Sequence, residues 1–117
     1  MTTETKRPGL DTFQAFEVAI EIIGALRAVV VVIRQYDAEL ARQVVRAANS
    51  IAANVAEGSR RVGKDRLHFF RIAAGSAEET WAHLQVALAR GYLESPAVEA
   101  ASKLIDRQLG LLWGLTH

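Results

Sequence analysis

An apolar repeat with helical spacing runs through residues 64–90 of the chain. Its members alternate at intervals of three and four residues, which places them in one seam along a helix. The seam consists of Leu67, Phe70, Ala74, Ala77, Trp81, Leu84 and Leu88. Small residues in its middle allow a neighbouring helix to approach closely. Because such a seam must be buried against other helices, the repeat predicts a helical bundle.

Three further segments carry helical periodicity, and no strand pattern competes over a comparable length. Asp37 can cap the second helix, and Gly91 ends the third. Ser95 as N-cap and Pro96 at the first helical position open the fourth. The expected helices span residues 11–35, 38–60, 64–90 and 95 to about 117. Since short connections make successive helices antiparallel, we expect an all-α fold, an antiparallel up-down-up-down four-helix bundle.

Length and composition indicate one globular domain. With 117 residues, 50% hydrophobic and 23% charged, the chain can bury a core without the support of metal or disulfides, and it has no cysteine. We expect a flexible tail at residues 1–10 and a single domain at residues 11–117. The N-terminus lacks the apolar core of a secretory signal, and the apolar run at residues 22–33 is too short to span a bilayer. A cytoplasmic protein without a membrane partner is therefore expected.

The first helix carries two apolar stripes, which is more than one helix needs to contact a single neighbour. One stripe is expected to face the core: Phe16, Ala19, Ile23, Leu26, Val30 and Ile33. The second is a candidate oligomer interface: Val18, Ile22, Ala25, Val29, Val32 and Tyr36. Two interpretations stay open, because the helix can either touch two neighbours of its own bundle or use the second stripe for self-association.

Positive charge is concentrated between residues 42 and 71. This segment contains seven basic and two acidic residues, whereas the net charge of the whole chain is only +1. The candidates for binding nucleic-acid phosphates are Arg42, Arg46, Arg60, Arg61, Lys64 and Arg66. Arginines on one side of a helix can match spaced phosphates. The alternative is a solvated helix face with internal ion pairs, such as Glu57 with Arg61.

Enzymatic chemistry finds little support in the sequence. The three histidines do not form the paired Glu-x-x-His motifs of bundle metal sites, although Glu79 and His83 share a helix face. No cysteine nucleophile and no glycine-rich phosphate loop after a strand are present. We therefore expect no catalytic residue, no metal site and no cofactor. Ser50 and Asn54 are unfavourable inside an exposed helix, so we expect them to make structural hydrogen bonds.

One family resemblance rests on motifs that occur in order along the chain. They are Gln43, Arg46-Ala47-Ala48-Asn49-Ser50-Ile51, Ala53-Asn54-Val55-Ala56-Glu57-Gly58, Phe70, Ile72-Ala73, Gly75-Ser76, Glu79 and Gly91-Tyr92-Leu93. This pattern resembles the bacterial four-helix bundle family related to proteins encoded in 23S (large-subunit) rRNA intervening sequences. The residues expected to serve a structural motif are Ser50, Asn54, Glu57, Gly58, Gly75, Ser76 and Glu79.

The resemblance implies a left-handed four-helix bundle that assembles into a homopentameric ring without known catalytic activity. Relatives include the accessory protein of diversity-generating retroelements, a pentamer with a basic surface that binds RNA and a reverse transcriptase. We therefore hypothesise a non-enzymatic homo-oligomer whose basic face, residues 42–66, binds RNA or DNA. The alternative hypothesis is an oligomeric scaffold that docks a protein partner and does not bind nucleic acid.

Overall fold

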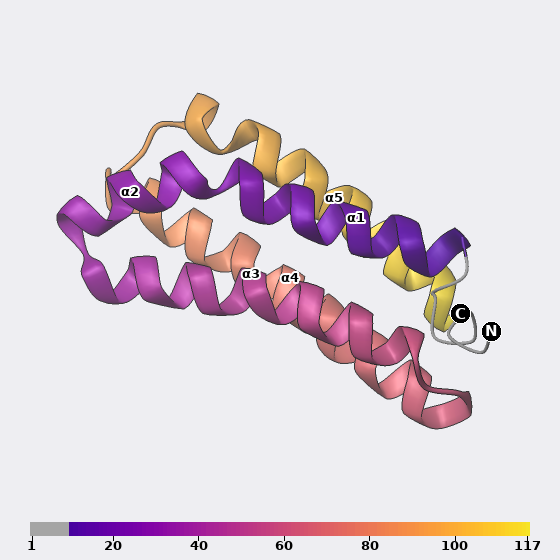
Figure 1. The fold of residues 1–117 in the computed structure, drawn as a ribbon. Coiled ribbons are helices and arrows are strands. Elements are labelled where there is room, and N and C mark those ends of the chain that lie inside the picture. Colours follow the sequence, from indigo (N-terminus) through magenta and orange to yellow (C-terminus); the bar gives the residue numbers. More distant parts are fainter. Residues whose placement is uncertain (1–9) are drawn as a thin grey trace.

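The computed structural model describes residues 10–117, which form five helices and no strand (Figure 1). The helices are α1 (Leu10–Ala25), α2 (Arg27–Tyr36), α3 (Ala38–Ser59), α4 (Gly63–Ala89) and α5 (Ser95–Thr116). The predicted all-α class is therefore confirmed. The predicted flexible tail at residues 1–10 lies outside the described residues, apart from Leu10, which begins α1.

The helices form an antiparallel bundle in which α1 and α2 together make one long arm (Figure 1). This arm runs beside α3, α3 lies beside α4, α4 lies beside α5, and α5 returns to α1. The chain thus alternates in direction from one arm to the next, as the short connections predicted. As a result, α1 packs against two neighbours of its own bundle, α3 and α5.

The first predicted helix is interrupted at Leu26, which separates α1 from α2. The backbone N–H of Leu26 donates to the carbonyl oxygens of both Ile22, at 3.0 Å, and Ile23, at 3.2 Å. Gly24 and the β-branched residues that follow all have low helix propensity, and glycines are common where helices bend. The prediction of one continuous helix over residues 11–35 was therefore wrong at this point.

The other helix ends follow the sequence signals closely. The Oδ1 atom of Asp37 accepts a hydrogen bond from the Leu40 N–H at 3.0 Å, which confirms the predicted cap. Gly91 adopts a φ of 79°, a left-handed conformation that favours glycine, and ends α4 as predicted. Pro96 lies in the first turn of α5, but Ser95 is already helical and Glu94 occupies the cap position.

The second apolar stripe of the first helix is mostly buried inside the bundle of this one chain, which corrects its assignment to an interface. Val18, Ile22 and Val29 are at most 4% exposed. Ala25 and Val32 are partly buried against the same core, and Tyr36 is 63% exposed and stacks on the Tyr92 ring. The physical reason is that α1 lies between α3 and α5 while α2 packs on α3, so most of both stripes is covered within one chain.

The buried row of α4 is rotated from the predicted seam, and Trp81 is 47% exposed. The fully covered row is Phe70, Ala73, Ala77, Thr80, Leu84 and Ala87. Because α4 packs against both α3 and α5, the row between these two neighbours is buried, and it holds Thr80 in place of Trp81. On α5 the buried Gln108 donates from Nε2 to the carbonyl oxygen of Ala15 at 3.0 Å and so links α5 to α1.

No described helix combines the length and the hydropathy needed to cross a membrane.

Candidate functional site

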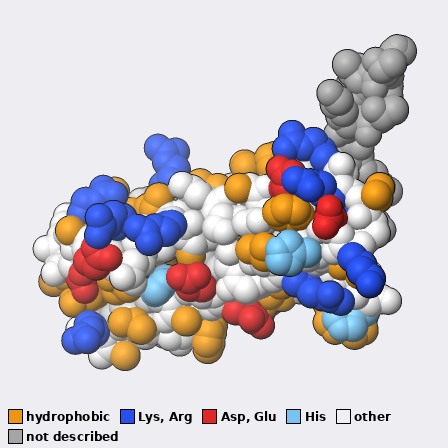
Figure 2. Space-filling model, turned by 90° about the horizontal axis from the view of Figure 1, so that it is seen from below, with side chains coloured by type: hydrophobic (Ala, Val, Ile, Leu, Met, Phe, Trp, Pro, Cys, Tyr) orange, Lys and Arg blue, Asp and Glu red, His pale blue; other side chains and the backbone are white. Residues whose placement is uncertain are grey.

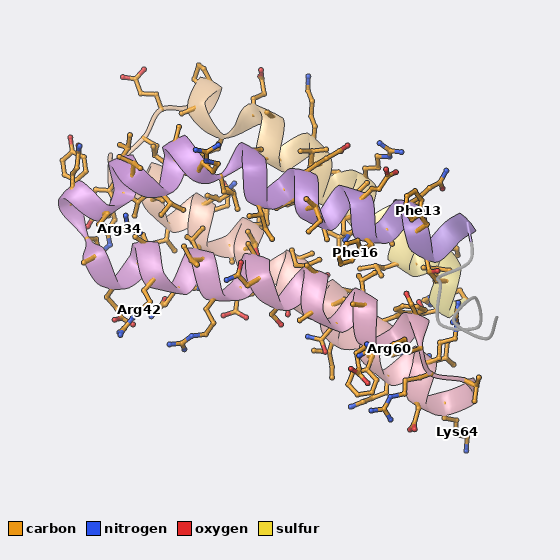
Figure 3. All side chains as sticks on the ribbon, viewed as in Figure 1. Phe13, Phe16, Arg34, Arg42, Arg60 and Lys64 are labelled. Carbon is orange, nitrogen blue, oxygen red and sulfur yellow. The ribbon has the colours of Figure 1, made fainter. Side chains whose placement is uncertain are left out.

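The predicted basic residues do not form one continuous face. Figure 3 shows Arg42 towards one end of α3, and Arg60 and Lys64 at the opposite end of the bundle. Arg42 and Arg60 are separated by about 27 Å along the helix axis at 1.5 Å per residue. In Figure 2, Lys and Arg side chains gather towards both ends of the visible face, with acidic side chains among them. The structure therefore divides the candidate residues into two groups.

At the connection between α3 and α4, acidic side chains offset much of the positive charge. The Glu57 carboxylate accepts hydrogen bonds from Arg61 Nε at 2.8 Å and from Arg60 Nη2 at 2.9 Å. These bonds, first that of Arg61, lower the pKa of Glu57. Arg61 also lies 3.5 Å from Asp65, and the ion pair expected between Glu57 and Arg61 is present.

Two arginines in this group also lie over aromatic rings. The guanidinium carbon of Arg61 is 4.9 Å from the centre of the Phe69 ring, and that of Arg66 is 5.0 Å from the centre of the Phe70 ring. Lys64 is exposed. Arg60 and Arg61 are thus engaged by carboxylates and Arg66 by an aromatic ring, so three of the four cations at this end already have protein partners.

The second group lies towards the opposite end of α3, the part of the molecule where a groove of about 270 Å³ separates α2 from α3. Its floor is apolar, with Ile23, Leu26, Val30 and Ala48, and its edges include Arg27, Arg34, Val45 and Asn49. Arg27 and Arg34 are seven residues apart, so they project from the same face of α2. Neither forms an ion pair with any other described residue.

Arg42 and Arg46 lie on the exposed side of α3 and do not line this groove themselves. Arg42 pairs with Glu39, whose pKa is lowered by hydrogen bonds from Gln43 first and then from Arg42. Arg46 is exposed and has no ion pair within the described part of the chain. We call Arg27, Arg34, Arg42 and Arg46 the arginine group. The sequence reasoning missed Arg27 and Arg34, although their seven-residue spacing, which places two arginines on one helix face, was a usable signal.

A polar contact joins α3 to α4 in the middle of the bundle. The hydroxyl oxygens of Ser50 and Ser76 lie 2.7 Å apart. Asn54 Nδ2 donates to the Ser50 carbonyl oxygen at 2.8 Å and to the Ser50 hydroxyl at 3.0 Å. The three motif residues thus form one hydrogen-bonded chain, which fits the structural role that we expected for Ser50 and Asn54.

The remaining motif residues lie apart from this chain. Gly58 faces the buried Phe70 ring so closely that a Cβ atom on it would lie 2.5 Å from Phe70 Cε1. Gly75 is exposed on α4. Glu79 lies 3.3 Å from His83 on the same helix. Within residues 10–117 no group of three or more His, Cys, Asp or Glu side chains is placed to hold a metal ion.

Comparison with known proteins identifies the fold. A crystal structure from Bacteroides thetaiotaomicron, of a protein with unknown function from the S23 ribosomal protein family, matches with a TM-score of 0.78. The two sequences are 19% identical, and the match covers 87% of this chain and 97% of that one, so the likeness concerns the fold. No curated protein matches the chain. The family model for the 23S rRNA-intervening sequence protein matches residues 13–114, and the chain therefore belongs to this family.

Proposed function

We propose that the protein is a non-enzymatic, cytoplasmic bundle that binds the phosphates of RNA or another nucleic acid and assembles with copies of itself. The observation that carries the first part is the arginine group, of which Arg27 and Arg34 line the α2–α3 groove. Arg27, Arg34 and Arg46 have no acidic partner among the described residues, and Glu39 pairs with Arg42 alone. Unpaired guanidinium groups suit phosphate, which they can bind through two parallel hydrogen bonds.

The spacing of these side chains supports contact with several phosphates. Arg27 and Arg34 are about 10 Å apart along α2 at 1.5 Å per residue. Arg42 and Arg46 add a second row on the neighbouring helix. Such an arrangement displaces counterions from a nucleic acid and needs no particular base sequence. In a ring of copies, this surface would recur and strengthen a weak individual contact.

Binding should depend steeply on salt through the arginine group. We expect the double variant Arg27→Gln with Arg34→Gln to make the slope of log affinity against log salt shallower by about two, because each lost phosphate contact removes nearly one unit. Fluorescence anisotropy with a short RNA duplex over a series of salt concentrations measures the slope.

The matched control is Arg60→Gln with Arg61→Gln, which also removes two arginines. We expect a smaller change from this variant, since Glu57 already engages both side chains. Equal effects of the two variants would assign binding to net charge in general. No binding by the wild-type protein at low salt, where electrostatic contacts are strongest, would refute the nucleic-acid proposal.

Self-association is supported by large apolar side chains on the outer side of the long arm. Phe13 and Ile20 are 46% and 48% exposed, and their seven-residue spacing places them in one row on α1. Figure 3 shows Phe13 on the outer side of α1, whereas Phe16 points towards α3. We propose this outer row as the interface in place of the buried stripe. A ring of five copies is the assembly that the family resemblance implies.

The outer row gives a direct test of assembly. Light scattering coupled to size exclusion should give a multiple of the 12.8 kDa chain for the wild type. We expect Phe13→Glu with Ile20→Glu to yield monomers with unchanged helical content, because charged side chains at an apolar interface lose their hydration. Val62→Glu is the control, since Val62 is 83% exposed at the distant α3–α4 connection. A monomeric wild type would disprove self-association.

A second candidate function is a scaffold that docks a protein partner without binding nucleic acid. The apolar floor of the α2–α3 groove favours it, because grooves of this kind accept the apolar face of a partner helix. The salt series separates the two candidates, since a scaffold would show no affinity for the RNA duplex.

A further inference from the structure

A second groove, of about 310 Å³, lies between α4 and α5 on a different part of the molecule. Arg71, Gly75 and Glu78 line it from α4, and Trp113 lines it from α5 together with His117. The space above Gly75 is open, because a Cβ atom at this position would have no heavy atom within 4 Å. The groove therefore has room for a flat group over the backbone of α4.

The aromatic side of the groove is built as a stacked pair. The rings of Trp113 and His117 are 4.3 Å apart between centres and 11° from parallel. His117 Nδ1 lies 3.0 Å from the Trp113 carbonyl oxygen and 3.1 Å from Thr116 Oγ1, which orients the imidazole. Trp113 nevertheless remains 64% exposed. An ordered, exposed indole is a suitable platform for stacking a nucleobase.

The charged side chains of the groove stand at its two ends. Arg71 and Glu78 are about 10 Å apart along α4 at 1.5 Å per residue. Neither forms an ion pair with another described residue. Because α4 and α5 are antiparallel, Arg71 lies towards His117, and Glu78 lies towards the earlier residues of α5. One end of the groove thus attracts an anion, and the other accepts hydrogen bonds.

We propose that this groove binds a guanine nucleotide. The base stacks on Trp113 over Gly75, the phosphate contacts Arg71, and the N–H groups of the base donate to the Glu78 carboxylate. Guanine fits this end because its ring N–H and exocyclic amine lie side by side and match the two carboxylate oxygens, whereas adenine has only its amine to donate. The nucleotide can be free or part of single-stranded RNA. The site does not depend on the arginine group, which lies on α2 and α3.

Tryptophan fluorescence tests the site directly. The chain has two tryptophans, so Trp81→Phe leaves Trp113 as the single reporter, and Trp81 lies outside the groove. Guanosine monophosphate should quench this fluorescence to saturation, because the base stacks on the indole. Arg71→Gln in this background should weaken binding about tenfold or more, the usual effect of losing a hydrogen bond to a charged group. Arg107→Gln, with the same loss of charge on α5 outside the groove, should leave binding unchanged.

The role of Glu78 has its own test. Glu78→Gln should remove the preference for guanosine over adenosine monophosphate, since the amide presents one acceptor oxygen instead of two. Absence of saturable quenching, or an Arg71→Gln variant that binds as tightly as its parent, would overturn the proposal.

A comparison of the affinities for guanosine monophosphate and for a single-stranded RNA that contains guanine distinguishes a free nucleotide from a nucleic-acid strand. Affinity at least about tenfold higher for the RNA would identify a nucleic-acid strand as the ligand, and equal affinity would identify the free nucleotide. The variant Arg27→Gln with Arg34→Gln should retain quenching by guanosine monophosphate. If the protein failed to bind the RNA duplex, the proposed guanine site would therefore not be refuted. If guanosine monophosphate failed to quench the fluorescence, the proposed role of the arginine group would not be refuted.

Discussion

Replacing Ile22 with aspartate should unfold the protein, whereas the same replacement at Ile20 should leave it folded. Ile22 is 0% exposed in the core formed where α1 meets α3 and α5. The change removes about 1.5–3 kcal/mol of apolar burial and places an unpaired carboxylate among apolar side chains, which costs several kcal/mol more. Small domains are stable by only about 5–15 kcal/mol, so a loss of this size is comparable to the whole free energy of unfolding.

Ile20 is the matched control, because it lies two residues away on the same helix and is 48% exposed. Circular dichroism of both variants during thermal unfolding measures the difference. We expect Ile20→Asp to keep its helical content and a cooperative transition, shifted only by the loss of contacts in the proposed outer row. If Ile22→Asp instead stayed folded and only dissociated an oligomer, Ile22 would belong to a subunit interface, and our placement of this stripe in the core would be incorrect.

Truncating Phe70 to alanine should cost about 3–5 kcal/mol of unfolding free energy, the usual range for a buried phenylalanine. Its side chain is 0% exposed and packs against Gly58 of α3, beside the connection between α3 and α4. The loss combines apolar burial with a cavity that the two helices cannot fully close. Chemical denaturation should show a lower midpoint with a similar slope, because the variant still unfolds from a compact state.

The opposite change at the same contact should also destabilise the protein. Gly58→Ala places a Cβ atom 2.5 Å from Phe70 Cε1, so the ring must shift. Overpacking of this kind costs about 1–3 kcal/mol, partly offset by about 1 kcal/mol of better helix propensity.

Gly110→Ala is the control for this change, because nothing lies within 4 Å of its new Cβ atom and only the gain in propensity remains. Combining Gly58→Ala with Phe70→Leu should cost less than the sum of the single changes, since the smaller side chain relieves the clash. Strict additivity would show that Gly58 and Phe70 do not interact.

Local signals in the sequence determined the helices, most of their ends and the family. Asp37, Gly91 and Pro96 act on backbone groups within a few residues, so their effects can be read without knowing the fold. The motifs around Ser50 and Gly58 identified the family, which the match over residues 13–114 confirms. The sequence did not reveal the break between α1 and α2 at Leu26, because the apolar pattern continues through this residue.

Only the tertiary structure decided which faces are buried and which residues meet. Apolar periodicity shows that Ile22 and Trp81 lie on apolar faces of their helices. Whether such a face is buried depends on which helices pack against it. In this bundle Ile22 is buried, whereas Trp81 is 47% exposed. In the same way, Arg71 and Trp113 are far apart in the chain and share a groove because α4 and α5 are antiparallel neighbours. Contacts between helices depend on packing of the whole bundle, which no local pattern encodes.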